Sequence, residues 1–261
     1  MASKLSSLAL HSLLVLALAA LLNLASNSLN LKTYFDTSSF SAKPTHNMTV
    51  KLYGSPSSTC TRRVATVLKE KNVPYELIPI DLGKGEHKKP EFTSLQPFGQ
   101  VPVLKDGDFT IYESRAIGRY IALKYGNQGT PGLIPSPSDF EAWGRFEEAA
   151  SIEQNNFDPF ASGISGEKIF KLMRGGTTDE KRVKELTDTL YAKLEAYEVI
   201  LSKRKYLAGD TITLADLFHL PYGTMITERL GIDALNSKPN VARWWKDITS
   251  RPSWQAVKDG A

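Results

Sequence analysis

The chain has 261 residues, of which 41% are hydrophobic and 23% charged, and its formal net charge is +4. This composition is ordinary for a globular protein of one or two domains, and it excludes disorder over most of the length. The single cysteine, Cys60, excludes an intramolecular disulfide and a metal site built from several cysteines. Three lysines and one aspartate fall in residues 1–47, so the remainder carries only about +2, which gives no electrostatic case for nucleic acid as a partner.

Residues 1–47 differ in composition from the rest of the chain. They hold nine serines and twelve leucines but one acidic residue, and residues 13–22 form an apolar run. The run is shorter than the ~20 apolar residues that span a bilayer, but it has the length of a secretory signal or a short anchor. The serine-rich, acid-poor residues 26–43 instead resemble an organellar transit peptide. We expect a targeting or extension segment, which translation from Met48 would omit, and no stable membrane span after residue 48.

The next part, residues 48–126, alternates short strand-like runs with helical ones. The patterns predict strands at residues 49–53, 75–80, 101–104 and 109–111, and helices at residues 59–71, 88–95 (weak) and 113–124. A helix joins the first two strands, so they should be parallel. The turn Asp106-Gly107 tolerates positive φ, so the last two strands should form an antiparallel hairpin. This order predicts an α/β domain.

Residues 126–139 contain three glycines and three prolines, which places a linker at residues 127–138 and an all-helical region at residues 139–261. A helix over residues 179–203 has one apolar face, formed by Val183, Leu186, Leu190, Leu194, Tyr197, Ile200 and Leu201. Residues 213–216 have the form of a capping box ahead of an expected helix at residues 217–230. Pro239 opens a further helix that ends near Arg251.

The turn after the first predicted strand is rich in hydroxyl groups. Ser57 and Ser58 lie near a helix N-terminus, where the dipole and free N–H groups stabilise an anion such as a thiolate. A thiol with a pKa of ~8.5 is only slightly ionised at pH 7, and lowering that pKa by two units requires about 2.7 kcal/mol. An ordinary helix cap is the alternative explanation for these serines.

One further feature presents backbone groups to a ligand, and another points to a ligand with a free amino-acid end. If Pro102 is cis, the backbone groups of Val101 face outward, toward a ligand. Ser114 and the N–H groups around it open a helix and favour a bound carboxylate, while Glu113 can take an ammonium group. The pair suits the γ-glutamyl end of glutathione, and a helix cap beside a solvated acid is the alternative.

Several linked segments carry a family resemblance. YGSPSSTCTRRV, GEHKKPEF, PFGQVPVLKDGD and YESRAIGRYIA occur in this order, followed by YLAGDTITLADLFHLP and RPSWQAV. Over about residues 48–259 the chain resembles the plant phi-class glutathione S-transferases. The resemblance implies a thioredoxin-like N-terminal domain followed by a C-terminal helical-bundle domain. It also implies a homodimer that conjugates glutathione, as a co-substrate, to hydrophobic electrophiles without a cofactor or metal, in glutathione metabolism, detoxification and stress response.

The resemblance also implies roles for individual residues. Ser58 takes the position of the catalytic serine that stabilises the glutathione thiolate, with Ser57 beside it. The glutathione site as a whole consists of Ser57, Ser58, His87, Lys88, Gln100, Val101, Glu113 and Ser114. Val101 pairs through its backbone with the cysteinyl part, and Glu113 and Ser114 hold the γ-glutamyl end. His87 and Lys88 bind the glycyl carboxylate with help from Gln100, although such a charged loop is also typical of a solvated surface.

Cys60 requires a separate interpretation, because related transferases with an active-site cysteine exchange thiols instead. Aligned on Arg63-Val64, that cysteine falls at Ser58. Cys60 is displaced by two residues, about 200° around a helix, so we expect it to point away from the thiol and to be a small buried core residue.

The second substrate is less well defined by the sequence. The region of the expected cleft contains Phe157, Phe160, Phe170 and Met173, whose spacing also suits core packing. His219 is expected to pack inside a buried helix. A glutathione peroxidase side activity is expected from the same thiolate, and the alternatives to an enzyme are a ligandin that carries hydrophobic metabolites or a protein-interaction module. Because glutathione is used in reducing compartments, we expect the cytosol, or a plastid if residues 1–47 are a transit peptide.

Overall fold

The computed structural model describes residues 49–261 and begins with a four-stranded mixed sheet. Its strands are β1 (Val50–Gly54), β2 (Tyr75–Pro79), β3 (Val103–Asp106) and β4 (Phe109–Tyr112), in the order β2-β1-β3-β4. Strand β1 is parallel to β2, and β3 is antiparallel to both β1 and β4, which confirms the two predicted pairings. Strand β3 begins two residues later than predicted, because Pro102 has no N–H for the ladder.

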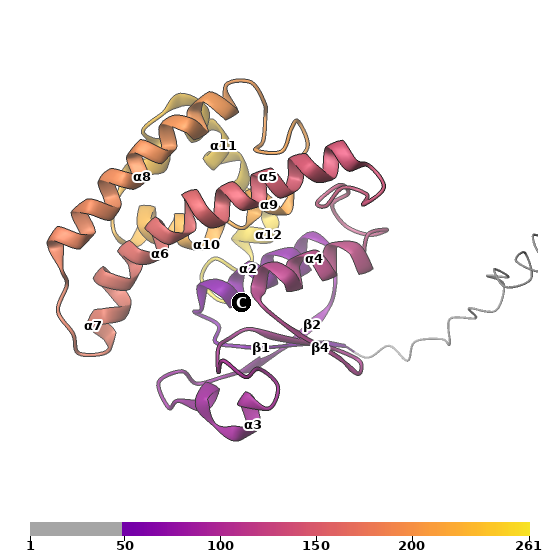
Figure 1. The fold of residues 1–261 in the computed structure, drawn as a ribbon. Helices are drawn as coiled ribbons and strands as arrows, with labels where there is room; N and C mark the ends of the chain where they lie inside the picture. The colour runs from indigo at the N-terminus through magenta and orange to yellow at the C-terminus, as the bar shows by residue number, and fades with distance from the viewer. Residues whose placement is uncertain (1–48) are drawn as a thin grey trace, which may run out of the picture. The chain divides into compact units, whose positions relative to one another are not determined.

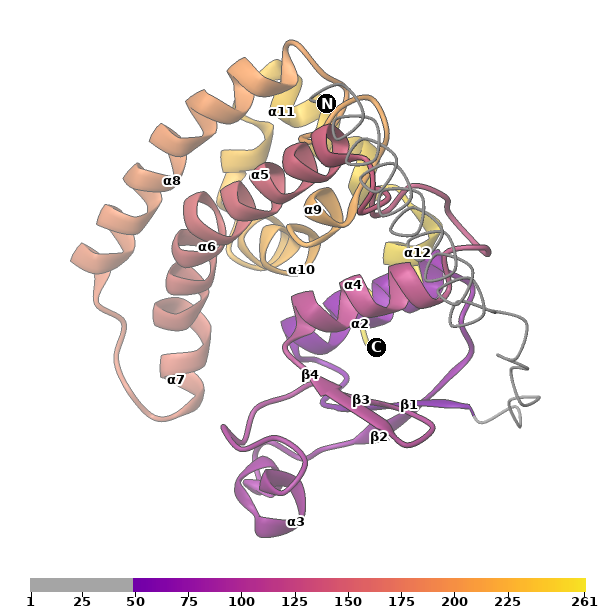
Figure 2. The ribbon, with the colours of Figure 1, turned by 45° about the vertical axis from the view of Figure 1, so that its right-hand side comes forward.

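Two helices cover one face of this sheet. Helices α2 (Thr59–Glu70) and α4 (Ser114–Lys124) lie side by side between the sheet and the helical half (Figures 1 and 2). They contribute Val64, Leu68, Ile117 and Ile121 to a core shared with Leu52 and Leu104 of the sheet. On the opposite face lie a 3-10 turn (Glu86–Lys88) and α3 (Pro90–Thr93), where one weak helix was predicted (Figure 1). Pro90 divides the two because it begins α3 without an N–H to continue the turn before it.

The second half is helical, as predicted. It comprises α5 (Phe140–Asn156), α6 (Asp158–Ser165), a π-helical turn (Gly166–Phe170), α7 (Lys171–Met173), α8 (Glu180–Leu201), α9 (Leu214–Leu217), α10 (Leu220–Thr224), a second π-helical turn (Met225–Arg229), a 3-10 turn (Asp233–Asn236), α11 (Pro239–Thr249) and α12 (Pro252–Gln255). The predicted apolar face of α8 is buried except for Ile200, which is partly exposed. Trp244 and Trp254 are among the largest fully buried side chains, so this half has a substantial core.

The capping box at Thr213 is confirmed, but the helix predicted over residues 217–230 is interrupted. Asp216 is fully buried, and its carboxylate accepts the N–H of Thr213 at 2.9 Å, that of Leu207 at 3.0 Å and the indole N–H of Trp244 at 2.9 Å. Burial raises the pKa of Asp216, and these bonds offset part of that shift. The break between α9 and α10 falls just before Pro221, which has no N–H for a continuous helix.

The segment between α4 and α5 contains no helix or strand, but it is attached to α2. The N–H of Thr130 donates to the carbonyl of Glu70 at 2.8 Å, and Nζ of Lys71 donates to the carbonyl of Thr130 at 2.9 Å. Gly129 has a φ of +63°, and a Cβ there would lie 2.2 Å from the carbonyl oxygen of Glu70. Only glycine fits this close approach, so the predicted linker is an ordered connection.

None of the helices in residues 49–261 is both long and apolar enough to cross a membrane. The predicted targeting or extension segment at residues 1–47 and the predicted alternative start at Met48 lie outside the described residues.

Candidate active site

Ser58 is the N-cap of α2. Its backbone is extended, with φ −66° and ψ 129°, and its Oγ accepts the N–H of Thr61 at 3.3 Å. Because Oγ is the acceptor in this bond, the hydroxyl hydrogen can still be donated to a ligand. Ser58 is partly exposed and Ser57 is exposed, so both are accessible at the end of the helix. A cap and a ligand donor are therefore compatible roles for Ser58.

Helix α4 begins with a strained residue followed by a buried hydroxyl. Glu113 is exposed and has a φ of +69°, a conformation that costs about 1–3 kcal/mol in a residue with a side chain and that clusters at functional sites. Ser114 is buried, and its Oγ accepts a hydrogen bond from the guanidinium of Arg63 at 2.9 Å. This bond connects the first turns of α2 and α4.

Two arginines behind these turns, buried Arg63 and partly exposed Arg115, were not identified from the sequence. Arg63 also donates to Asp158 at 3.3 Å and to the carbonyl of Phe218 at 3.3 Å, which links α2 to the helical half. Arg115 forms two bonds of 2.7 Å with Glu153. Burial alone would lower the pKa of Arg115, but the bonds to Glu153 and Asp158 raise it. No local pattern in the sequence marks either arginine, because their carboxylate partners lie in distant segments.

The loop before β3 contains the predicted cis peptide bond between Val101 and Pro102. Val101 is partly exposed, and no residue within 49–261 pairs with its backbone N–H or C=O. Nζ of Lys88 donates to the carbonyl of Phe98 at 3.0 Å, so Lys88 lies against this loop. Gln100 is exposed with its N–H bonded to Gln96 at 3.2 Å.

His87, beside Lys88, is partly buried, and its Nδ1 is buried without a hydrogen-bond partner among residues 49–261. An unpaired buried nitrogen is uncommon in folded proteins. Because this nitrogen is shielded from solvent, it is not itself an accessible contact point for a ligand.

The strand register brings these separate segments to one edge of the sheet. Gly54, the last residue of β1, pairs with the last residue of β2, and Tyr53 pairs with the first residue of β3. That residue, Val103, in turn pairs with Tyr112 at the end of β4. The turn that holds Ser58, the Val101 loop and the start of α4 therefore all lie at this edge, and the loop that leads to His87 begins there.

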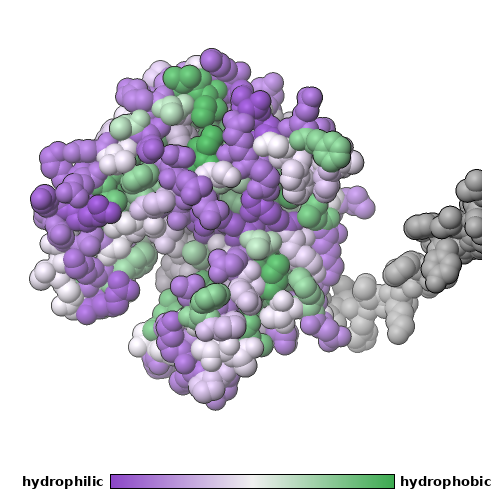
Figure 3. All heavy atoms as spheres, in the orientation of Figure 1, coloured by the Kyte–Doolittle hydropathy of each residue, from purple (hydrophilic) through white to green (hydrophobic). Residues whose placement is uncertain are grey.

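A cavity of about 550 Å³ opens beside Ser57. The loop after β2, including Leu82, forms one wall, and Met173 of α7 lies at the opposite wall. Figure 3 shows this side of the molecule hollowed between α7 and the sheet. Met173 is 78% exposed and is the only one of the four cleft candidates that lines this cavity, whereas Phe157 is fully buried in the core.

The prediction that Cys60 is a buried core residue is wrong. Its side chain is partly exposed, and its Sγ accepts a hydrogen bond from Arg63 at 3.4 Å. The reason is that Arg63 is fully buried near the same helix turn and occupies the interior space that a core cysteine would fill. The packing role of His219 is confirmed: it is fully buried, bonds to Tyr197 at 3.0 Å, and burial lowers its pKa to about 3.

Comparison with known proteins agrees with this fold and arrangement. The family model for the glutathione S-transferase N-terminal domain matches residues 48–123, and that for the C-terminal domain matches residues 159–252. The chain is 54% identical over 200 residues to glutathione S-transferase PM239X14 of Arabidopsis thaliana, covering 76% of this chain and 90% of the relative. It is 42% identical to glutathione S-transferase F9 of the same plant, covering 80% and 95%.

Solved structures show the same relationship. Glutathione transferase F7 from Populus trichocarpa superposes with a TM-score of 0.75 at 39% identity, covering 80% of this chain and 97% of that one. Glutathione S-transferase I from mais, in complex with an atrazine glutathione conjugate, gives 0.75 at 38% identity, covering 81% and 97%. The chain belongs to the glutathione S-transferase family. Within that family it groups with the phi class.

Proposed function

We propose that this protein conjugates glutathione to hydrophobic electrophiles, with Ser58 stabilising the thiolate. The observation that carries the proposal is the position of Ser58 at the N-terminus of α2, with its hydroxyl hydrogen available and its oxygen held by Thr61. A hydroxyl donor and the partial positive charge of a helix end both favour a thiolate over a thiol. Ionising the nucleophile and aligning it with an electrophilic carbon then accelerate the reaction.

The remaining candidate residues suit the other parts of the tripeptide. Glu113 offers a carboxylate for the γ-glutamyl ammonium, and Ser114 lies at a helix N-terminus suited to the adjacent carboxylate. Val101 offers an unpaired backbone N–H and C=O for the cysteinyl residue. Lys88 supplies a cation for the glycyl carboxylate, and we propose that His87 and Gln100 assist it.

The cavity beside Ser57 is the proposed site for the electrophile. Its apolar surface includes Leu82 and the largely exposed Met173, which can cover a hydrophobic substrate next to the thiol. The sulfur of Met173 sits on a flexible side chain that adapts to ligands of different shape. Relatives named as glutathione S-transferases favour the enzyme over a ligandin or an interaction module.

The test is turnover of 1-chloro-2,4-dinitrobenzene and of an organic hydroperoxide with glutathione. At pH 7 we expect both activities in the full chain, a loss of about 25-fold in Ser58→Ala, and little change in Ser250→Ala, which removes an exposed hydroxyl at the end of α11. A rise in the thiol pKa from ~6.5 to ~8.5 lowers the ionised fraction at pH 7 by about this factor. Glutathione binding without turnover of either substrate would contradict the proposal and support the ligandin instead.

The oligomeric state of the protein is proposed from the family, and its location from the use of glutathione in reducing compartments. We propose a homodimer, which sedimentation would detect as twice the mass of the 28.9 kDa chain. We also propose that the protein lies in the cytosol or a plastid. Fluorescent fusions of the full chain and of a form beginning at Met48 would test this, and entry of the full-length fusion into the secretory pathway would contradict it.

A further inference from the structure

The sheet face opposite α2 and α4 carries two neighbouring rows of side chains, each running across three strands. The polar row is Glu76, Lys51 and Lys105, and the apolar row is Ile78, Tyr53 and Val103. Alternate residues of a strand face opposite sides, so Lys51 and Tyr53 lie on the face away from the fully buried Leu52. The register places Glu76 and Lys105 beside Lys51, in neighbouring strands. It places Ile78 and Val103 beside Tyr53 in the same way. The two rows are one two-residue step apart, roughly 7 Å.

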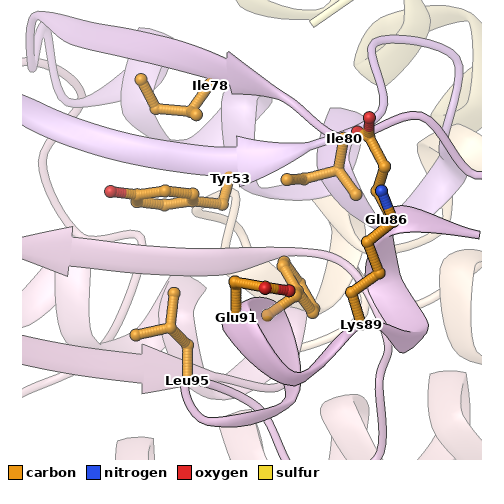
Figure 4. Close-up of a pocket in the computed structure, with 8 residues that line it drawn as sticks. Tyr53, Ile78, Ile80, Glu86, Lys89, Glu91 and Leu95 are labelled. Atoms are coloured by element: carbon orange, nitrogen blue, oxygen red, sulfur yellow. The ribbon is translucent and has the colours of Figure 1, made fainter.

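The apolar row continues into a cavity between the sheet and α3. The cavity has a volume of about 350 Å³, and its apolar wall consists of Tyr53, Ile78, Ile80, Phe92 and Leu95 (Figure 4). Ligand pockets in proteins begin at about 300 Å³, so the space suits a small aromatic molecule. No residue of the proposed glutathione site lines this cavity. It shares only Ile80 and Glu86 with the cavity beside Ser57.

The polar row lines a second cavity, of about 370 Å³, that contains two lysines. Lys51 and Lys105 are directly opposite each other on adjacent strands, where like charges repel. Nζ of Lys51 is 3.9 Å from the carboxylate of Glu76, with both side chains about half exposed, and Lys105 forms no ion pair within residues 49–261. An anion placed between the two lysines relieves their repulsion.

Tyr53 lines both cavities and connects them. Figure 4 shows its hydroxyl directed away from Glu86 and Lys89, the charged residues at the far end of the apolar cavity. Glu91 lies between the two ends of the apolar cavity. The carboxylates of this cavity outnumber its single lysine, whereas the two lysines of the second cavity outnumber its single carboxylate, so an anionic group is favoured in the second cavity. The phenol hydroxyl has no partner among residues 49–261 and can donate to a bound carboxylate.

We propose that this face of the sheet binds a small aromatic carboxylate, at a site separate from the catalytic one. The ring of the ligand packs against Tyr53 and Ile78 in the apolar cavity. Its carboxylate lies between Lys51 and Lys105, at the end away from Glu86. The inference does not depend on the proposed catalytic function, since the two sites use different residues apart from the shared wall.

The test uses 2-naphthoate as the probe, with calorimetric titration of the full chain. A saturating concentration of S-hexylglutathione fills the catalytic site, and we expect the affinity for 2-naphthoate to be unchanged by it. Lys105→Gln should weaken binding about 10-fold, the effect of losing one charge-assisted hydrogen bond. Lys181→Gln, on the exposed surface of α8, removes the same charge elsewhere and should leave the affinity unchanged.

Two further measurements separate the parts of the proposal. The neutral 2-naphthamide should bind the unaltered chain about 10-fold more weakly than 2-naphthoate does. In Lys105→Gln the two compounds should bind with equal affinity. Ile78→Asp, at a partly exposed position, should abolish binding of both compounds. Displacement of 2-naphthoate by S-hexylglutathione, or an unchanged affinity in both Lys105→Gln and Ile78→Asp, would overturn the proposal.

Discussion

The two ends of helix α2 differ in how their polar groups are used. At the N-terminal end, Ser57 and Ser58 are accessible and the hydroxyl hydrogen of Ser58 is available. At the C-terminal end the carboxylate of Glu70 is buried and receives bonds from Arg251, at 2.5 and 2.7 Å, from Ser253 at 2.5 Å and from Thr130. The difference indicates that one end anchors the helix to the linker and to α12, while the other presents groups to a ligand.

Substitution at the C-terminal end of α2, where Glu70 is buried, should show the largest effect on stability. Burial alone would raise the pKa of Glu70, but its bonds to Arg251, Ser253 and Thr130 lower it, so the ionised carboxylate is held in place. We expect Glu70→Ala to cost about 3 kcal/mol of unfolding free energy, at the lower end for a broken buried pair because Arg251 is 23% exposed. Chemical denaturation measures this. Glu185→Ala, which removes an exposed pair with Arg182, should cost under about 1 kcal/mol, and equal losses in the two variants would contradict the comparison.

The contact between α2 and α4 should show a smaller effect that extends to binding. Ser114→Ala removes the acceptor for buried Arg63, and an unsatisfied buried donor costs about 1–3 kcal/mol. We also expect the KM for glutathione to rise, since the same residue lies in the proposed γ-glutamyl site. Ser114→Thr keeps the hydroxyl, so it should recover part of the lost unfolding free energy and part of the lost affinity for glutathione. A variant Ser114→Ala with wild-type stability and KM would show that this connection has no role.

Buried His219, in the helical half beside α2, should make the unfolding free energy depend on pH. Burial lowers the pKa of His219 to about 3, whereas an unfolded histidine titrates near 6.5. Between these values the unfolded chain binds more protons, so the unfolding free energy should fall as the pH drops below about 6.5, by up to ~1.4 kcal/mol per pH unit from this group. Denaturation at pH 7.5 and 5.5 measures the loss. In His219→Gln the loss should be smaller, and an identical pH dependence would exclude His219 as its source.

The smallest effect is expected from Cys60, at the N-terminal end of α2. Its Sγ contacts Arg63 but neither caps the helix nor donates to the proposed thiolate position. Cys60→Ala should keep conjugation activity within about twofold of the unaltered chain in the 1-chloro-2,4-dinitrobenzene assay. A loss comparable to that of Ser58→Ala would instead assign the chemistry to the cysteine and reverse the proposed mechanism.

The features predicted from the sequence depend on local patterns. The Asp106-Gly107 turn predicted the β3–β4 hairpin, and the helix between β1 and β2 predicted their parallel pairing. The hydroxyl at Ser58 and the helix start at Ser114 were visible as caps, and the order of the motifs identified them as parts of one site. The register confirms that their segments share one edge of the sheet.

The features that the sequence did not predict depend on contacts between distant residues. Arg63 bonds to Asp158 across 95 positions, and Glu70 bonds to Arg251 across 181, so no local periodicity indicates either pair. Cys60 was assigned to the core because cysteine is usually buried, whereas the interior near it is occupied by Arg63. The position of Met173 at a cavity wall depends on how the helical half packs against the sheet half.

The most direct test of the central claim is the pKa of the glutathione thiol when it is bound to the protein. The thiolate absorbance can be followed against pH for the unaltered chain, for Ser58→Ala and, as a control, for Cys60→Ala. The account predicts a pKa about two units below the ordinary ~8.5 in the unaltered chain and in Cys60→Ala, and a return to ~8.5 in Ser58→Ala. An equally low pKa in Ser58→Ala would contradict the claim that Ser58 stabilises the thiolate.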